Sequence, residues 1–325
     1  MKLFVIIVTY NGARWMESCL GCLRTSTVPV VPVVVDNDST DNTVEVIETS
    51  FPEAVLIRSK ENLGFGKANN IGIEYALRQG ADYLFLLNQD AWIFPDTLEH
   101  MVAVHQKHPE YHIISPLHLD GTLEQLDDNF AKWISAGDCP GLLSDLAVKG
   151  GPVKEVYGAS FVNAALWLLP RECAQVTGGF NPLFRHYGED NNFVHRVLFH
   201  GYKLGVCPGA RGVHDRRQGP FDWGRMPLKS RLRRRQIASL IPLMNVKESF
   251  AKCLGKAASV YLKFLLKDAA GLKVGELLLD VGYSLGLLLR LPQVLRNRAR
   301  SKQRNGAFLD LPAAKKAVVE NAVAH

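Results

Sequence analysis

The sequence of 325 residues predicts an α/β fold, in which a mostly parallel sheet flanked by helices occupies residues 1–225 and a basic helical extension occupies residues 226–325. Three observations support this prediction. Continuous β-branched runs without polar alternation are typical of strands buried on both faces of a parallel sheet. Segments with apolar residues at helical spacing separate these runs, as in right-handed βαβ units. Beyond Met226 the strand pattern stops, and Leu, Lys and Arg dominate.

Strands and helices are expected to alternate through the first 115 residues. A helical pattern follows Asn11-Gly12, and Ser39-Thr40-Asp41 is expected to cap a second, short helix. A third helix is predicted over residues 65–78, and a fourth is capped by Asp96 and reaches about Lys107. The predicted strands lie over residues 2–9, 30–35, 54–57, 83–87 and 111–115.

The pattern is weaker in the rest of the first part. Residues 117–151 are polar and contain glycine, so long loops or a short hairpin are expected there. Residues 153–170 resume an extended pattern and residues 189–199 a helical one. Residues 203–207 form a short predicted strand that leads to His214.

The net charge of +6 is the sum of two very different parts. Residues 1–225 carry 19 Lys and Arg against 26 Asp and Glu, a net charge of −7, whereas residues 226–325 carry 19 against 6, a net charge of +13. Six scattered cysteines make no disulfide framework, and the N-terminal apolar run is too short for a signal peptide, so a cytoplasmic location is expected. The longest apolar stretch, residues 277–291, is shorter than the roughly 20 residues that span a bilayer, so no transmembrane helix is expected.

Polar side chains follow three of the predicted strands where each one ends: Thr9-Tyr10-Asn11, Asp36-Asn37-Asp38 and Asn88-Gln89-Asp90. Ligands bind beyond the carboxyl ends of the strands in open α/β sheets, so the three clusters should meet at one crevice. Asn88 and Asp90 offer oxygen ligands suited to Mg²⁺ or Mn²⁺, although a turn with a helix cap explains them equally well. Asp36 could accept hydrogen bonds from a nucleobase or a ribose.

Three further segments carry candidate residues. Residues 62–70 form a glycine-rich turn that opens a helix, and its backbone N–H groups could approach phosphates, but they match neither the P-loop nor the dinucleotide-binding pattern. Glu189 and Asp190 precede a predicted helix, where carboxylates either cap the helix or act as a general base. His214 is either an ordinary surface residue or a ligand.

The order of these motifs resembles that of the family 2 inverting glycosyltransferases of GT-A fold, particularly the rhamnosyltransferase-like branch. The resemblance covers about residues 3–217. After the strand-end clusters and residues 62–70, its further matching segments are residues 158–160, 178–180 and 187–190, and His214. It implies that Asp190 is the catalytic base with Glu189 beside it. The metal ligands that it implies are Asp90, Asn88 and His214. The implied donor contacts are Thr9, Tyr10, Asn11, Asp36, Gly64, Asn69 and Asn88, and the implied acceptor-side segment is Gly178, Gly179 and Phe180.

The same resemblance implies an activity. The chain would transfer a sugar, with rhamnose the first expectation, from a dTDP- or UDP-sugar to a hydroxyl of a glycan or lipid-linked acceptor in surface polysaccharide synthesis, using Mg²⁺ or Mn²⁺. Two alternatives remain. A sugar-1-phosphate nucleotidyltransferase has a similar fold, but normally carries a basic, glycine-rich loop where this chain has Thr9-Tyr10-Asn11-Gly12. A non-catalytic sugar-nucleotide-binding scaffold would explain Asn88 and Asn192, which stand where many relatives have Asp.

The basic tail has two arginine clusters with leucine-rich helical segments between them. Apolar helix faces flanked by cations suit a helix that lies on an anionic membrane surface, which predicts peripheral attachment to the cytoplasmic face of the inner membrane. The alternative is that the leucines pack on the first part of the chain or on a partner subunit. Nucleic-acid binding is not expected, because the clusters lack interleaved aromatic residues.

Overall fold

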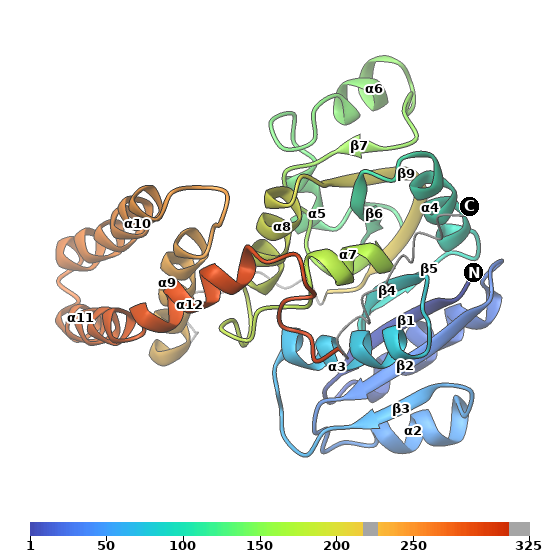
Figure 1. Cartoon of the computed structure of the whole chain (residues 1–325), viewed down its shortest axis with the longest axis horizontal. Coiled ribbons are helices and arrows are strands. Elements are labelled where there is room, and N and C mark those ends of the chain that lie inside the picture. Colours follow the sequence, from blue (N-terminus) through green and yellow to red (C-terminus); the bar gives the residue numbers. More distant parts are fainter. Residues whose placement is uncertain (217–226, 312–325) are drawn as a thin grey trace, which may run out of the picture.

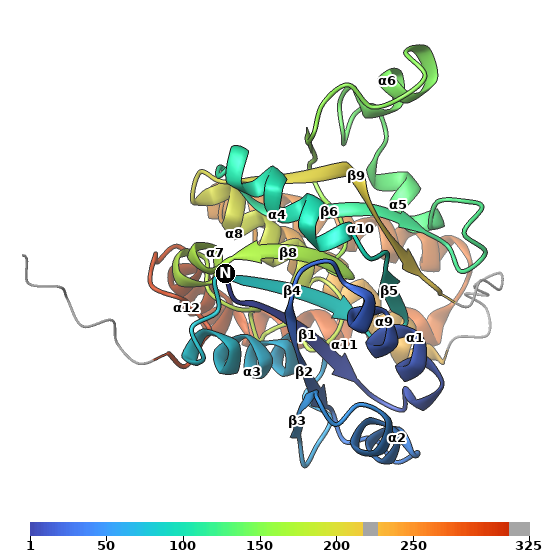
Figure 2. The ribbon, with the colours of Figure 1, turned by 90° about the vertical axis from the view of Figure 1, so that its right-hand side faces the viewer.

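The computed structural model describes residues 1–216 and 227–311, and this part of the chain contains one mixed β-sheet of nine strands (Figure 1). The strands follow the order β3-β2-β1-β4-β8-β6-β9-β5 across the sheet, and β7 pairs with β9. Figure 2 shows this order from the strand β9 at the top to β3 at the bottom. The predicted α/β fold class is confirmed.

The half of the sheet built from the N-terminal residues is parallel. It consists of β1 (Leu3–Thr9), β2 (Val30–Asp36), β3 (Val55–Arg58) and β4 (Tyr83–Asn88). The apolar runs of β1 and β4 are buried on both faces, which explains their lack of polar alternation. The register places Thr9 beside Asp36 and Val8 beside Asn88. The predicted polar clusters therefore share one edge of the sheet.

The other half of the sheet is mixed. Strand β6 (Tyr111–Leu119) pairs in parallel with β9 (Lys203–His214), but β8 (Leu166–Pro170) is antiparallel to both β4 and β6. Strands β5 (Ala91–Ile93) and β7 (Tyr157–Gly158) are antiparallel to β9. The sequence does not predict these reversals, because a short run that is buried on both faces has the same pattern in either direction.

Two expectations for this half are wrong in extent. Residues 117–151 contain a short hairpin-like turn, closed by an antiparallel bridge between Leu119 and Leu126, but also the helices α5 (Asp128–Trp133) and α6 (Leu142–Val148), which the sequence does not predict. Helices of six or seven residues are too short for apolar periodicity to reveal them. The strand predicted over residues 203–207 continues to His214, so that His214 lies in the sheet itself.

Helices cover both faces of the sheet and enclose two apolar cores. One face carries α3 (Phe65–Arg78), α7 (Arg171–Val176) and α8 (Glu189–Phe199). The other face carries η1 (Ala13–Trp15), α1 (Met16–Gly21), η2 (Cys22–Thr25), α2 (Thr43–Ser50) and α4 (Thr97–Lys107).

The two predicted helix caps differ in outcome. Asp41 accepts a hydrogen bond from the backbone N–H of Thr43 at 3.1 Å, at the start of α2. Asp96 occupies the N-cap position of α4, but its side chain makes no capping hydrogen bond and lies 3.5 Å from Nδ1 of His100 instead. The N-cap residue of α2 is Asn42, whose side chain makes no capping hydrogen bond either, so the contact of the preceding Asp41 with Thr43 is the part of the two predicted caps that forms.

Four helices follow in the C-terminal part, as predicted, and stand to one side of the sheet (Figure 1). They are α9 (Leu228–Leu243), α10 (Phe250–Ala270), α11 (Val274–Leu289) and α12 (Leu291–Ser301). Within the described ranges, none of the helices combines the length and the apolar character that crossing a membrane requires.

Several cations of the tail serve its internal structure. Arg235 of α9 pairs with Asp268, with Asp280 at 2.7 Å and with Glu276 at 3.0 Å, and Arg231 pairs with Glu276 at 3.0 Å. These contacts join α9 to α10 and α11. An ionic cluster that is mostly buried is therefore the electrostatic centre of the three-helix unit, and these two arginines are not free to bind another molecule.

The end of the described chain returns to the first part. The backbone N–H of Gly179 donates to the carbonyl of Ala307 at 2.9 Å, and Nδ2 of Asn70 donates to the carbonyl of Phe308 at 3.2 Å. Nearby, the N–H of Asp310 donates to Glu74 at 2.7 Å. Residues 306–310, which we call the return segment, thereby tie the helical extension to α3 and to the loop between α7 and α8.

This contact predicts a stability effect at Gly178. Its φ of +84° favours glycine, and a Cβ there would collide with the backbone of Ala307. We expect Gly178→Ala to lower the free energy of unfolding by about 2 kcal/mol or more, measured by denaturant titration. The control Gly137→Ala adds its Cβ to open space and should stay within about 0.5 kcal/mol of the native chain. Equal stability of the two variants would contradict the docking of the return segment.

Candidate functional site

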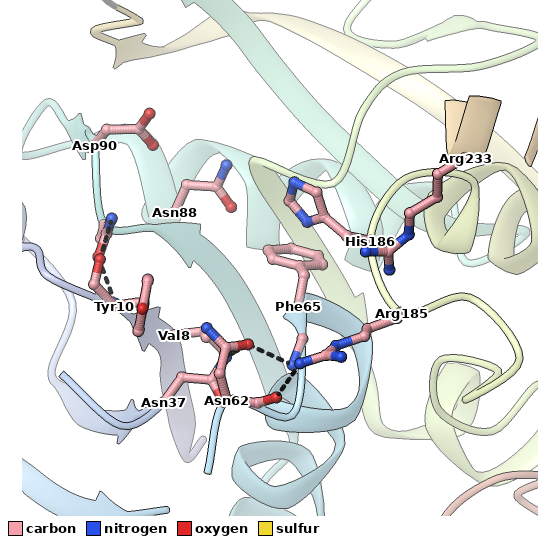
Figure 3. A pocket seen from close by; sticks show the side chains of 12 residues that line it. Val8, Tyr10, Asn37, Asn62, Phe65, Asn88, Asp90, Arg185, His186 and Arg233 are labelled. Carbon is pink, nitrogen blue, oxygen red and sulfur yellow. Dashed lines mark hydrogen bonds between the residues drawn. The ribbon is translucent and has the colours of Figure 1, made fainter. Parts of the chain in front are cut away.

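A cavity of about 630 Å³ opens at the carboxyl ends of β1 and β4 (Figure 3). Its size is typical of sites that enclose a small ligand. Asn88 and Asp90 lie on one side of it, and Arg185, His186 and Arg233 lie on the other. The full lining consists of Val8, Tyr10, Asn37, Asn62, Gly64, Phe65, Asn88, Gln89, Asp90, Arg185, His186 and Arg233.

Gln89 holds the end of β1 in place through hydrogen bonds. The sequence predicts site roles for its neighbours Asn88 and Asp90, but not for Gln89 itself. Its Oε1 accepts hydrogen bonds from Oγ1 of Thr9 at 2.8 Å and from the backbone N–H of Tyr10 at 2.9 Å. Thr9 is fully buried, whereas the ring of Tyr10 is exposed and lines the cavity. Thr9 therefore positions this turn, and Tyr10 is the member of the pair that a ligand can touch.

One carboxylate oxygen of Asp36 is buried and has no hydrogen-bond partner. Its Oδ2 accepts from the backbone N–H of Ser39 at 3.2 Å, but its Oδ1 has no hydrogen-bond partner, although the residue is only 4% exposed. A buried carboxylate oxygen without a partner is costly, so a donor group from a ligand would stabilise it. The next residue, Asn37, lines the cavity and accepts from the N–H of Leu63 at 2.8 Å.

Asn88, Asp90 and His214 meet, as the sequence analysis expects of metal ligands. The pairing of β5 with β9 places Ala91 opposite His214. Nε2 of His214 consequently lies 3.4 Å from Oδ1 of Asp90 and 3.4 Å from Nδ2 of Asn88. Burial alone would raise the pKa of Asp90, but the hydrogen bond and charge of His214, together with the charge of Arg216, lower it below the ordinary value.

Two residues behind His214 have no counterpart in the sequence analysis. Nε of Arg216 lies 3.1 Å from Nδ1 of His214 and 3.2 Å from Oδ2 of Asp127. Asp127 is buried and also caps α5 by accepting from the N–H groups of Asn129 and Phe130. Asp127 lies within residues 117–151, where the sequence pattern is weakest. Its residue type, which is common at helix N-caps, is the feature of the sequence that could have pointed to it.

The side chains of Asn88, Asp90 and His214 suit a hard divalent cation that is coordinated partly by the protein and partly by a bound substrate. Within residues 1–216 and 227–311, no three side chains of His, Cys, Asp or Glu are grouped as a metal site. Asp90 and His214 supply two such groups, and Mg²⁺ or Mn²⁺ commonly uses few protein ligands together with water and substrate phosphates. In this structure Nδ1 of His214 accepts from Nε of Arg216 at 3.1 Å, so the imidazole proton lies on Nε2, which faces Asp90. For Nε2 to bind a cation, this proton must leave Nε2.

Glu189 and Asp190 form the first turn of α8. Glu189 is buried and its Oε2 has no partner. Burial raises the pKa of Glu189, and the neighbouring charge of Asp190 raises it further. Burial also raises the pKa of Asp190, which is partly exposed and whose Oδ1 accepts from the N–H of Asn191 at 2.8 Å. A carboxylate with a raised pKa is a better proton acceptor, as general-base catalysis requires.

Arg216 connects the two carboxylate centres. Its positive charge lowers the pKa of Asp90 and opposes the rise in the pKa of Asp190. The cation thus acts on both carboxylates, although neither Glu189 nor Asp190 is among the residues that line the cavity.

Other predicted contacts lie away from the cavity. Asn11 faces a separate hollow near Asp41, where its Oδ1 accepts from the N–H of Thr40 at 2.8 Å. Nδ2 of Asn69 donates to the carbonyl of Phe65 inside α3. Gly178, Gly179 and Phe180 lie under the return segment, and none of these five residues lines the cavity described above. The roles given to them by resemblance remain predictions.

Gly64, like Tyr10 and Asn88, is a predicted donor contact that lines the cavity. Its φ is +80°, and its Cα faces the backbone carbonyl of Arg185, so a side chain would not fit between the two loops. Nη2 of Arg185 donates to the carbonyl of Asn62 at 3.0 Å, which closes this wall. Burial, and then the charges of Arg233 and Arg234, lower the pKa of His186, the neighbouring residue of the wall.

Known structures share this architecture. Staphylococcus aureus TarS, residues 1–349 in complex with UDP-GlcNAc, aligns with a TM-score of 0.55 at 16% identity over 87% of this chain and 80% of that one. A mannosyltransferase of Pyrobaculum calidifontis in complex with GDP-Man and Mn²⁺ aligns with a TM-score of 0.53 at 19% identity over 93% and 86% of the two chains. The fold is therefore of the GT-A type.

Sequence comparison adds a partial match to a family. Residues 4–123, which include Asp36 and Asp90, match the profile of "Glycosyl transferase family 2". An uncharacterized glycosyltransferase of Rickettsia typhi is 29% identical over 103 residues, which are 32% of this chain and 31% of that protein. The putative glycosyltransferase EpsH of Bacillus subtilis is 28% identical over 101 residues, which are 30% and 28% of the two chains. The matches thus span about a third of these curated relatives.

The buried carboxylate of Glu189 predicts a pH-dependent stability effect. Its raised pKa means that the folded chain binds the proton more tightly than the unfolded chain, so its contribution to stability falls as the pH rises above the unfolded value. We expect Glu189→Gln to raise the free energy of unfolding at pH 8 by about 1 kcal/mol or more and to have less effect at pH 4. The exposed Glu45→Gln is the control and should change little at either pH. A gain that is the same at both pH values would refute the explanation.

Proposed function

We propose that this chain is an inverting glycosyltransferase that transfers a sugar from a nucleoside diphosphate to an acceptor hydroxyl with the help of Mg²⁺ or Mn²⁺. The observation that carries the proposal is the meeting of Asp90, Asn88 and His214 beside the 630 Å³ cavity. This site lies at the end of the parallel strands, where α/β sheets bind ligands. The family 2 match over residues 4–123 includes the two aspartates of the donor side, Asp36 and Asp90.

The walls of the cavity suit a nucleotide sugar. The unpartnered Oδ1 of Asp36 can accept from an N–H of a base or an O–H of a ribose. Arg185 and Arg233 bring positive charge to the opposite wall, where a diphosphate would be stabilised. The TarS and mannosyltransferase structures hold UDP-GlcNAc and GDP-Man, which supports a donor of this class. A dTDP- or UDP-sugar is the proposed donor, and rhamnose is proposed from the branch resemblance alone.

The proposed reaction is a single displacement at the anomeric carbon. A bound divalent cation would neutralise charge on the diphosphate leaving group, with Asp90, Asn88 and His214 as its protein ligands. Asp190 accepts the proton of the acceptor hydroxyl, for which its carboxylate must be ionised. Burial raises the pKa of both Glu189 and Asp190, and the charge of Asp190 raises that of Glu189 further. One displacement inverts the anomeric configuration.

The alternatives receive less support. A nucleotidyltransferase would need the basic loop after β1 that this sequence lacks, and the profile match is to a glycosyltransferase family. For a binding scaffold, the buried Glu189, whose Oε2 has no hydrogen-bond partner, would be a cost without a benefit. Glycan or lipid-linked acceptors of surface polysaccharide synthesis remain the proposed partners.

Two substitutions separate donor binding from chemistry. Asp90→Ala should weaken binding of UDP in the presence of Mn²⁺ by about tenfold or more in calorimetry, because a ligand of the cation is lost. Asp190→Asn should bind UDP normally but lower sugar transfer by about 10²- to 10⁴-fold, measured with a panel of nucleotide sugars. The exposed Asp128→Ala on α5 is the control for both measurements. Full transfer by Asp190→Asn would refute the base, and unchanged UDP affinity of Asp90→Ala would refute the metal ligand.

A peripheral position on the inner face of the cytoplasmic membrane is also proposed. The outer surface of α10 and α11 exposes large apolar side chains, with Leu272 at 86% and Leu289 at 83% exposure. Exposed lysines such as Lys263 and Lys267 lie on the same unit. Exposed apolar groups beside cations are the combination that adsorbs to anionic lipid. This surface, rather than the paired Arg231 and Arg235, would make the contact.

Vesicle sedimentation tests this position. The full chain should pellet with vesicles containing anionic lipid and less with neutral vesicles, and Leu262→Asp combined with Leu266→Asp on α10 should lower the bound fraction severalfold. Leu143→Asp on α6 changes an exposed leucine far from this surface and is the control. Equal sedimentation of the native chain and the α10 variant would contradict the proposal.

A further inference from the structure

A second cavity, of about 330 Å³, lies between the helical extension and the loop before α8. Its walls come from α9, α11, α12 and residues 183–185. Most of the lining is apolar, and part of it belongs to a small hydrophobic core that joins the two parts of the chain. The apolar side chains are Leu183, Phe184, Ile237, Leu240, Leu287 and Val294.

Positive charge surrounds this apolar space. Arg185, Arg233 and Arg290 line it, and no carboxylate does so among the described residues. None of the three arginines forms an ion pair within the described ranges, unlike Arg235 in the nearby ionic cluster. Guanidinium groups without a carboxylate partner beside an apolar lining are complementary to a molecule that joins an anion to a hydrocarbon chain.

The second cavity adjoins the first. Arg185 and Arg233 line both cavities, so one pair of side chains forms the boundary between them. Figure 3 shows these two arginines at the edge of the first cavity, opposite Asn88 and Asp90. A molecule whose anionic group contacts this boundary therefore lies next to the space assigned to the nucleotide sugar.

We propose that the second cavity binds the phosphate group and the adjoining hydrocarbon of a lipid phosphate that carries the acceptor hydroxyl. That this molecule is the acceptor rests on the proposed function, whereas the binding of a lipid phosphate does not. Arg290, which lines the second cavity and not the first, holds the phosphate, and the apolar lining takes the first part of the hydrocarbon chain. The exposed apolar surface of α10 and α11 belongs to the same helical unit, so the remaining hydrocarbon can stay in a membrane.

Binding of decyl phosphate to the full chain, measured by calorimetry below its critical micelle concentration, tests the site. Inorganic phosphate is the probe for the head group alone, and decyl maltoside is the probe for an uncharged amphiphile. We expect decyl phosphate to bind at least tenfold more tightly than either probe. Equal affinity for phosphate would reduce the site to an anion site, and equal affinity for decyl maltoside would reduce it to an apolar groove; either result overturns the proposal.

Two variants locate the binding. Arg290→Glu reverses an exposed charge of the second cavity and should weaken decyl phosphate binding by about tenfold or more. Leu287→Gln places an amide in the apolar wall and should weaken it severalfold. Arg296→Glu, an equally exposed change on α12 outside the cavity, is the control. Each variant is first checked by thermal unfolding, and a folded Arg290→Glu chain that binds like Arg296→Glu overturns the assignment.

A separate measurement distinguishes this site from the donor site. UDP with Mn²⁺ should bind the Leu287→Gln chain as it binds the native chain, and saturating UDP should leave decyl phosphate bound. If UDP and all nucleotide sugars fail to bind while decyl phosphate binds, the proposed function fails and the lipid phosphate site stands. If UDP binds and decyl phosphate does not, the lipid phosphate site fails alone. Competition between the two ligands would place the phosphate in the donor cavity and overturn the second site.

Discussion

The pairing of β5 with β9 is the contact on which the candidate site depends. It connects two strands that are more than a hundred residues apart in the sequence and sets Ala91 opposite His214. Without it, Asp90 would be one carboxylate in a turn after β4. With it, the imidazole of His214 lies against Asp90 and Asn88, and Arg216 and Asp127 hold the imidazole from behind. Because hydrogen-bonded strands hold their register rigidly, these three side chains meet without an adjustment of the backbone.

Charge and burial divide the site into two parts with different chemistry. Beside His214 and Arg216, the pKa of Asp90 is lowered, which keeps this carboxylate ionised and suited to a cation. At the start of α8, burial raises the pKa values of Glu189 and Asp190, which suits the exchange of a proton. The same residue type thus acquires opposite properties within one site, because neighbouring charge dominates in one place and desolvation in the other.

The basic extension is less separate from the catalytic part than its charge implies. Its arginines are divided among an internal ionic cluster, contacts with the first part and the wall shared by the two cavities. Arg304, for example, donates to the carbonyl of His200 at 3.3 Å and to the hydroxyl of Tyr202 at 2.9 Å. The return segment then anchors the end of the described chain on α3. The extension therefore contributes to the fold and to the shape of the site, in addition to the membrane surface proposed for it.

The sequence by itself determined the parallel half of the sheet, because its buried strands and amphipathic helices leave strong local patterns and end in Asp36, Asn88 and Asp90. It also identified Glu189, Asp190 and His214 as candidates, through the order of motifs. Only the tertiary structure decided the antiparallel strands, the short helices within residues 117–151, and the places of Arg185, Arg216 and Arg233. Strand direction and the neighbours of an arginine depend on contacts between distant segments, and a local pattern carries no information about such contacts.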